Sequence, residues 1–71
     1  MNNSRRKQIK HVLVRLEEVL RRILVEEKDA FENMPESLQL SANGITSEEA
    51  QDYLESAADC IAEAITYLED I

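Results

Sequence analysis

The 71-residue sequence has only one Gly and one Pro, the residues that most readily break helices, and only one Cys and one His; it has no Trp. Cys60 has no second cysteine to pair with inside the chain, and one His with one Cys cannot complete a four-ligand zinc site. We therefore expect no disulfide within the chain, no metal and no cofactor; a disulfide between two chains, or redox sensing, is the alternative use of Cys60. Because a domain of this size buries only a modest share of its surface, oligomerisation is the remaining source of extra stability.

Long apolar stretches are also missing. The longest runs are three residues, such as residues 12–14, whereas a membrane-spanning helix needs about 18. The basic start of the chain is not followed by the apolar core of a signal peptide. Together with the unpaired thiol, these features predict a cytoplasmic protein without a membrane segment. The sequence also lacks a nucleophile–base pair, a phosphate-binding loop and a set of metal ligands, so we predict that the protein is not an enzyme.

The apolar residues that are present recur in alternating steps of three and four, which is typical of one face of a helix. We predict one domain, residues 1–71, with a helix at about 4–33, a corner at 34–46 and a second helix at about 47–70. The expected packing seam of the first helix consists of Ile9, Leu13, Leu16, Leu20, Ile23, Glu27, Ala30 and Met34. The expected seam of the second helix consists of Ala50, Leu54, Ala57, Ile61, Ala64, Leu68 and Ile71.

Local signals in the corner place the helix ends. Thr46 and Glu49 have the spacing of a capping box at the start of the second helix. The preceding residues 43–44, Asn-Gly, favour a turn. Pro35 ends the first helix and suits the first position of a new, short helical turn.

These elements predict an all-α fold: an antiparallel two-helix hairpin with a short helical turn in the connection, self-associating into a helical bundle. We expect Phe31 and Leu38 to plug the corner end of the hairpin. Glu27, a polar residue at a seam position near that end, is expected to be solvated or bonded to the corner backbone.

Charge is divided along the chain. All eight Lys and Arg residues precede residue 29, so residues 1–28 carry a net charge of +4 and residues 29–71 carry −11, which gives −7 overall. In an antiparallel hairpin the basic start of the first helix lies beside the acidic end of the second. We therefore expect Glu69 and Asp70 to compensate basic side chains that oppose the dipole of their own helix.

The chain has more apolar side chains than one hairpin covers, so we predict a homo-oligomer, with a dimer forming a four-helix bundle favoured. Tyr53, Cys60 and Tyr67 recur at seven-residue intervals beside the seam of the second helix. The predicted oligomer interface consists of Val12, Leu16, Val19, Ile23, Leu24, Tyr53, Cys60 and Tyr67. Part of this surface has an alternative use, the binding of a different protein.

Two charged surfaces are further candidates. The acidic surface is expected to dock on a basic groove of a partner or to imitate the phosphate charge of DNA, with a purely solubilising role as the alternative. It consists of Glu48, Asp52, Glu55, Asp59 and Glu63. The basic surface favours only weak, salt-sensitive phosphate contacts, which the acidity of the rest of the chain opposes. It consists of Arg5, Arg6, Lys7 and Lys10.

The corner and the acidic helix after it resemble a group of small, mostly uncharacterised acidic helical-hairpin proteins of bacterial phages and mobile elements. The resemblance covers roughly residues 26–71. The matching positions are Glu26, Glu27, Ala30, Phe31, Asn33, Met34, Pro35, Glu36, Ser37, Leu38 and Gln39. It implies a helical hairpin and a mobile-element setting, and it brings no established activity.

The sequence therefore predicts a non-enzymatic protein-binding module. If the mobile-element setting holds, its partner is a host defence or nucleic-acid-processing protein that the acidic surface blocks. One alternative is a nucleic-acid-associated accessory protein that uses the basic surface. Another is a purely structural oligomerisation protein.

Overall fold

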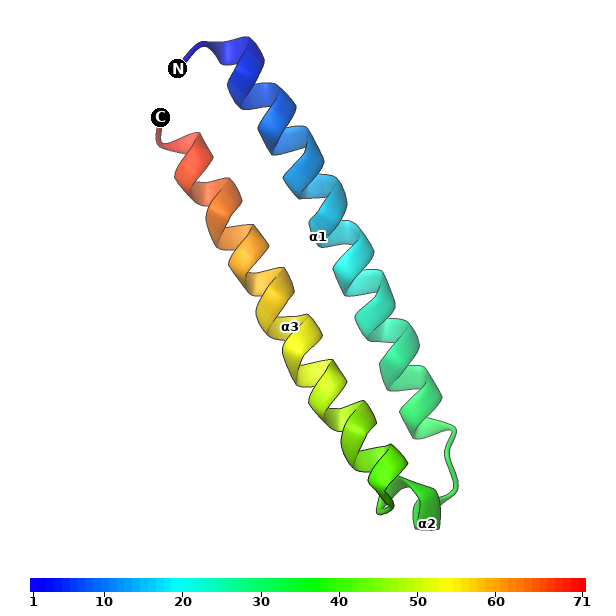
Figure 1. Ribbon diagram of the computed structural model, residues 1–71. Helices are drawn as coiled ribbons and strands as arrows, with labels where there is room; N and C mark the ends of the chain where they lie inside the picture. The colour runs from blue at the N-terminus through cyan, green and yellow to red at the C-terminus, as the bar shows by residue number, and fades with distance from the viewer.

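A computed structural model describes the whole chain, Met1–Ile71, and shows three helices and no strands (Figure 1). Helix α1 spans Asn3–Glu32, α2 spans Glu36–Gln39 and α3 spans Ala42–Glu69. The two long helices pack against each other and run in opposite directions, so both chain ends lie at one end of the molecule and the corner lies at the other (Figure 1). The expected all-α fold is confirmed. We call the end that holds both termini the open end.

Helix α1 begins where the sequence supplies a cap. The Asn2 side chain accepts a hydrogen bond from the backbone N–H of Arg5 at 2.9 Å, which satisfies one of the amides that the first turn of a helix leaves free. The helix ends at Glu32, so the observed bounds differ by one residue at each end from the expected 4–33.

A side-chain amide closes the corner. Gln39 Nε2 donates to the backbone oxygens of Phe31 at 3.0 Å and Met34 at 3.2 Å, so the end of α1 is tied to α2. The expected short helical turn is present as α2, but Pro35 is its N-cap rather than its first residue. The Pro35 backbone is not helical, with φ −55° and ψ 147°, and its carbonyl oxygen accepts from the N–H groups of Leu38 and Gln39.

The start of α3 departs most from the prediction. The helix begins at Ala42, five residues earlier than expected, with Ser41 as its N-cap. Thr46 is therefore not a cap, because it lies inside the helix and its hydroxyl donates to the Ala42 carbonyl oxygen at 2.9 Å. Asn43 and Gly44 are helical and do not form a turn.

The position of Gly44 explains this early start. Its φ is not positive, so the residue is not needed for an unusual backbone conformation. Instead, Gly44 is buried against the backbone of Gln39, where an added Cβ atom would overlap Gln39. The missing side chain allows the first turn of α3 to approach the corner closely.

The contact between α1 and α3 is rotated from the predicted seams. On α1, buried and half-buried side chains form a row at Lys10, Leu13, Glu17, Leu20, Leu24, Glu27 and Phe31. On α3, the corresponding row is Ser47, Gln51, Leu54, Ala58, Ile61, Ile65 and Leu68. We call these rows the inner seams. They include several polar residues, so a prediction centred on apolar positions alone misplaces the contact.

The hairpin has a small core. Leu24 and Ala58 are its buried hydrophobic residues, and no large side chain is completely enclosed. Ser47 is also buried, and its hydroxyl donates to Glu27 Oε1 at 2.7 Å. Glu27 is therefore bonded to α3 and not to the corner backbone. Leu38 does not plug the corner, because it is 47% exposed and the Gln39 amide closes that end instead.

Candidate protein-interaction surfaces

Helix α1 carries a row of apolar side chains that α3 leaves uncovered. Each residue of this row immediately precedes an inner-seam residue in the sequence. The row is therefore turned about 100° around the helix axis from the contact with α3. Its members are Ile9, Val12, Leu16, Val19 and Ile23. Val19 is half-buried, and the other four side chains are between 39% and 63% exposed.

Helix α3 carries a second row, again one residue before its inner seam. Its members are Ala50, Tyr53, Ala57, Cys60, Ala64 and Tyr67. The two tyrosines are the most open members, with Tyr53 76% and Tyr67 66% exposed. Cys60 is a free, exposed thiol. Small residues alternate with tyrosines and the cysteine along this row.

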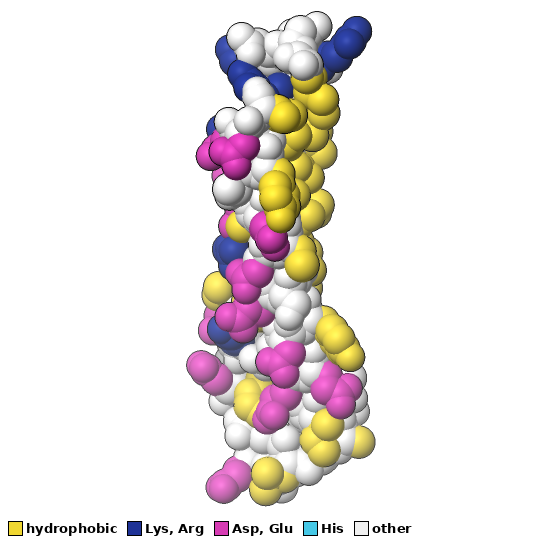
Figure 2. Space-filling view, turned by 90° about the vertical axis from the view of Figure 1, so that its left-hand side faces the viewer, with side chains coloured by type: hydrophobic (Ala, Val, Ile, Leu, Met, Phe, Trp, Pro, Cys, Tyr) yellow, Lys and Arg dark blue, Asp and Glu magenta, His cyan; other side chains and the backbone are white.

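Both rows lie on the same face of the hairpin. Viewed from the open end, a step back of one residue turns a side chain anticlockwise on α1 and clockwise on the antiparallel α3. The inner seams of the two helices point toward each other, so these opposite rotations bring both rows to the same side of the hairpin. Figure 2, seen from the α3 side, shows hydrophobic side chains along one edge, most densely toward the open end. We call the two rows together the apolar face.

Every residue of the predicted oligomer interface except Leu24 belongs to the apolar face. Leu24 is only 7% exposed and lies in the core between α1 and α3, so its assignment to an oligomer interface is wrong. One residue separates Leu24 from Ile23, and that step of about 100° carries the side chain from the apolar face to the inner seam. The prediction also places Ile9 and the three alanines of the face in the hairpin seam, because heptad spacing alone does not distinguish the two rows.

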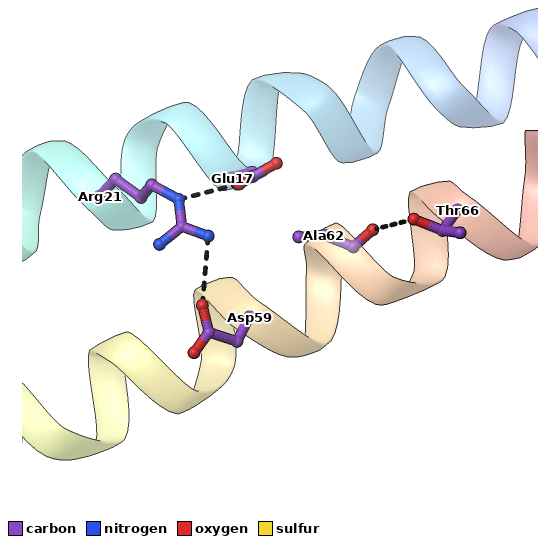
Figure 3. Close-up of polar contacts among 5 residues, drawn as sticks. All are labelled: Glu17, Arg21, Asp59, Ala62 and Thr66. Atoms are coloured by element: carbon purple, nitrogen blue, oxygen red, sulfur yellow. Dashed lines mark hydrogen bonds and ion pairs between the residues drawn. The ribbon is translucent and has the colours of Figure 1, made fainter.

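On the opposite face, Arg21 links the two long helices (Figure 3). Its Nε donates to Glu17 Oε2 at 2.8 Å, and its Nη2 donates to Asp59 Oδ1 at 3.3 Å. The hydrogen bonds that it donates to Glu17 and to Asp59 raise the pKa of Arg21 above its usual value. Arginine is charged at physiological pH without such a shift, and the exposure of Arg21 limits what the pairs add to stability. Thr66 bonds only within α3, donating to the Ala62 oxygen at 3.2 Å.

All residues of the predicted acidic surface are exposed on α3, and acidic side chains cover much of the view in Figure 2. They differ in their bonding. Asp59 is paired with Arg21, and Glu63 accepts a hydrogen bond from the Tyr67 hydroxyl at 3.2 Å. Glu48, Asp52 and Glu55 make no ion pair, so their charge is directed at solvent.

The predicted basic surface lies at the open end, and part of it is occupied. Lys10 Nζ lies 3.0 Å from Glu69 Oε1, which joins the basic start of α1 to the acidic end of α3. Arg6 donates to the backbone oxygen of Ile71 and to the Asn3 side chain. The other two cations of this surface, at positions 5 and 7, make no ion pair.

The remaining surface of the hairpin shows no metal site and one shallow depression of note. No group of three or more His, Cys, Asp or Glu side chains is placed to hold a metal ion. None of the helices combines the length and the apolarity needed to cross a membrane. The larger of two surface depressions is open and lies along the first turns of α1. Its lining residues are Ser4, Lys7, Gln8, His11 and Val12.

The fold and its surfaces define a small helical hairpin with one apolar face and one acidic face. No protein-family model matches the chain, and neither a curated protein nor a solved structure was found to be similar to it.

Proposed function

We propose that the protein is a non-enzymatic protein-binding module that self-associates through its apolar face. The observation that carries this proposal is the pair of exposed apolar rows on one side of the hairpin. Rows of this spacing are the surfaces by which helices pack into coiled coils and four-helix bundles. The small core supports the same conclusion, because a domain of this size needs an additional source of stability.

The acidic surface is proposed to bind a second, different protein. Self-association occupies the apolar face and leaves α3 free on its other side, where Glu48, Asp52 and Glu55 point into solvent without partners. A basic groove on a host defence or nucleic-acid-processing protein is the chemistry that this surface complements. This finer proposal depends on the phage or mobile-element setting that the corner sequence suggests.

Two alternatives remain as proposals. A purely structural oligomerisation protein would use the apolar face and nothing else. A nucleic-acid-associated accessory protein would rely on the basic surface, where Lys10 is already paired with Glu69. Because few cations are left free there, phosphate binding would be weak and sensitive to salt.

The experiment compares two double variants with the same chemical change. Val12→Glu with Val19→Glu places two carboxylates on the apolar face, whereas Val14→Glu with Val25→Glu places them on α1 outside that face. Val14 and Val25 are 37% and 56% exposed, so both sites accept a polar side chain. Size-exclusion chromatography with light scattering should show a dimer or larger species for the wild type and the control variant, and a monomer for the apolar-face variant.

Circular dichroism at high protein concentration would establish that both variants remain helical. A wild-type protein that is monomeric at micromolar concentration would contradict self-association. Equal loss of assembly in both variants would contradict the assignment of the interface to the apolar face.

A further inference from the structure

We infer that the apolar face is covered by the apolar face of a second copy of this chain, with both corners at the same end of the dimer. In this arrangement α1 of each copy packs on α3 of the other, and the two-fold axis runs parallel to the helices. The inference rests on the proposed self-association and adds which helices meet and in which direction.

The hairpin exposes more surface than a compact protein of its mass, and a second copy would cover the excess. A compact protein of 8.2 kDa exposes about 4,500 Å², whereas this chain exposes 5318 Å². The excess is close to the roughly 800 Å² that each partner buries in a standard protein–protein interface. The shape agrees with this, since the radius of gyration is 16.2 Å and a compact chain of this length has about 11 Å.

The ion pairs of the hairpin fix which residues of α1 and α3 lie at the same level. Lys10 is level with Glu69, and Arg21 is level with Asp59. A two-fold axis parallel to the helices moves no residue along them. Residues of α1 and α3 that lie at the same height within one hairpin therefore also lie at the same height between the two copies.

At these levels large side chains meet small ones. Leu16 lies opposite the partner's Ala64, and Ile23 lies opposite the partner's Ala57. Val19 lies level with the partner's Cys60. Facing layers that alternate large and small side chains interdigitate well. The reverse arrangement, with the corners at opposite ends, would place the branched side chains of α1 against each other and the alanine row of α3 against itself.

Charges at the margin of the apolar face favour the same arrangement. Arg15 lies at the outer margin of the α1 row. In the proposed same-end dimer, which has both corners at one end, Arg15 is level with the partner's Glu63. In an opposite-end dimer, which has the corners at opposite ends, Arg15 would instead lie near the partner's Arg22. Within one chain, these arginines have only long contacts with neighbouring acids, 3.6 Å for Arg15 with Glu18 and 4.0 Å for Arg22. Oppositely charged margin positions select partner and orientation in helical bundles.

Same-end packing also brings the two acidic corners to one end. These acids lie beyond the end of the α1 row and face water, where charges more than about 8 Å apart are largely screened at physiological ionic strength. Their repulsion therefore opposes the dimer only weakly compared with the packing of the apolar face.

Cysteine crosslinking tests the arrangement, because Cys60 is present in each copy. Val19→Cys places a thiol on α1 level with the partner's Cys60, and Val14→Cys places one on α1 outside the apolar face as a control. Each protein is oxidised by air with copper–phenanthroline, run on a non-reducing gel and mapped by mass spectrometry. We expect Val19→Cys to give a covalent dimer joined through positions 19 and 60, and the wild type and the control to stay largely uncrosslinked.

The other outcomes overturn the inference. A disulfide between two Cys60 residues in the wild type, or one that joins position 19 of both copies in the Val19→Cys variant, would show the opposite-end arrangement while leaving self-association intact. A disulfide between positions 19 and 60 within one chain, seen as a crosslinked monomer, would show that these residues meet inside the hairpin. A wild-type protein that light scattering shows to be monomeric would remove the inference together with the proposed function.

A second variant guards against local effects at position 19. Ile23→Cys with Ala57→Cys, on a Cys60→Ser background, pairs another level of the two rows. We expect a covalent dimer joined through positions 23 and 57. Failure of both variants to crosslink, in a protein that remains dimeric by light scattering, would overturn the same-end arrangement.

Discussion

Gln39 and Gly44 both shape the corner: Gln39 through the hydrogen bonds of its side chain, and Gly44 because it has no side chain. Gln39 supplies a side-chain amide to two carbonyl oxygens at the end of α1. Because Gly44 has no Cβ atom, the first turn of α3 can lie against the backbone of Gln39. The motif that is most recognisable in the sequence is thus a structural joint between helices.

The first prediction concerns Gly44→Ala. Helix propensity alone predicts that this change stabilises the protein by about 1 kcal/mol, because Gly44 is inside a helix. The structure predicts the opposite sign: the new Cβ overlaps the Gln39 backbone and lowers the free energy of unfolding by about 1–3 kcal/mol. Urea unfolding followed by circular dichroism measures the difference. Asn43→Ala, one residue earlier and exposed, should change stability by no more than about 0.5 kcal/mol. A stabilised Gly44→Ala protein would contradict the described corner.

At the scale of the helices, the sequence predicts the existence of α1 and α3 well and their rotation poorly. The three-and-four rhythm of apolar residues locates both helices, and it places the bounds of α1 within one residue. The rhythm is equally compatible with two adjacent rows on each helix. Polar pairs such as Ser47 with Glu27 decide which row faces the other helix, and they are recognisable only once the two helices are aligned.

The start of α3 is beyond a local prediction for a related reason. Thr46 and Glu49 have the spacing of a capping box, and local sequence favours a helix that begins there. The close approach of Gly44 to Gln39 is a contact between separate elements, and it lets the helix extend back to Ala42. A prediction from neighbouring residues alone cannot include such a contact, and it therefore places the start of α3 too late.

The second prediction concerns the outer surface of α3. Asp52→Lys with Glu55→Lys reverses two unpaired acids, and it should reduce capture of a basic protein partner from host lysate by roughly ten-fold or more, since like charges across an interface cost several kcal/mol. Quantitative mass spectrometry of the captured proteins measures this loss, with helicity checked by circular dichroism. Glu18→Lys with Glu26→Lys makes the same change of charge on α1 and should leave capture largely intact. Equal capture by both double variants would argue against the acidic surface as the binding site.

Across the hairpin as a whole, the proposed self-association would couple folding to association. One hairpin measures 54 × 14 × 12 Å and buries few apolar side chains, so in the proposed dimer much of the favourable burial would come from contact between copies. When the folded state of a small protein depends on a partner subunit, its apparent stability is inseparable from its concentration.

The third prediction follows from this coupling. Raising the protein concentration about a hundred-fold should raise the Tm by roughly 5–10 °C, because mass action favours the associated, folded state. Thermal unfolding followed by circular dichroism in cells of different path length measures the shift. The variant with Val12→Glu and Val19→Glu should lose the concentration dependence, and the variant with Val14→Glu and Val25→Glu should keep it. A wild-type Tm that is independent of concentration would contradict the coupling.

The uneven distribution of charge gives the hairpin an electrical polarity along its length. At the open end, cations such as Lys10 offset the acids at the end of α3. Toward the corner, the acids of α1, α2 and the first half of α3 outnumber the bases, so most of the net charge of −7 lies in one half of a rod 54 Å long. At low ionic strength, where screening is weak, a positively charged surface therefore exerts a torque on the approaching molecule and turns it corner first. The acids nearest the corner, Glu48 and Asp52 among them, would reach such a surface before Asp59 and Glu63.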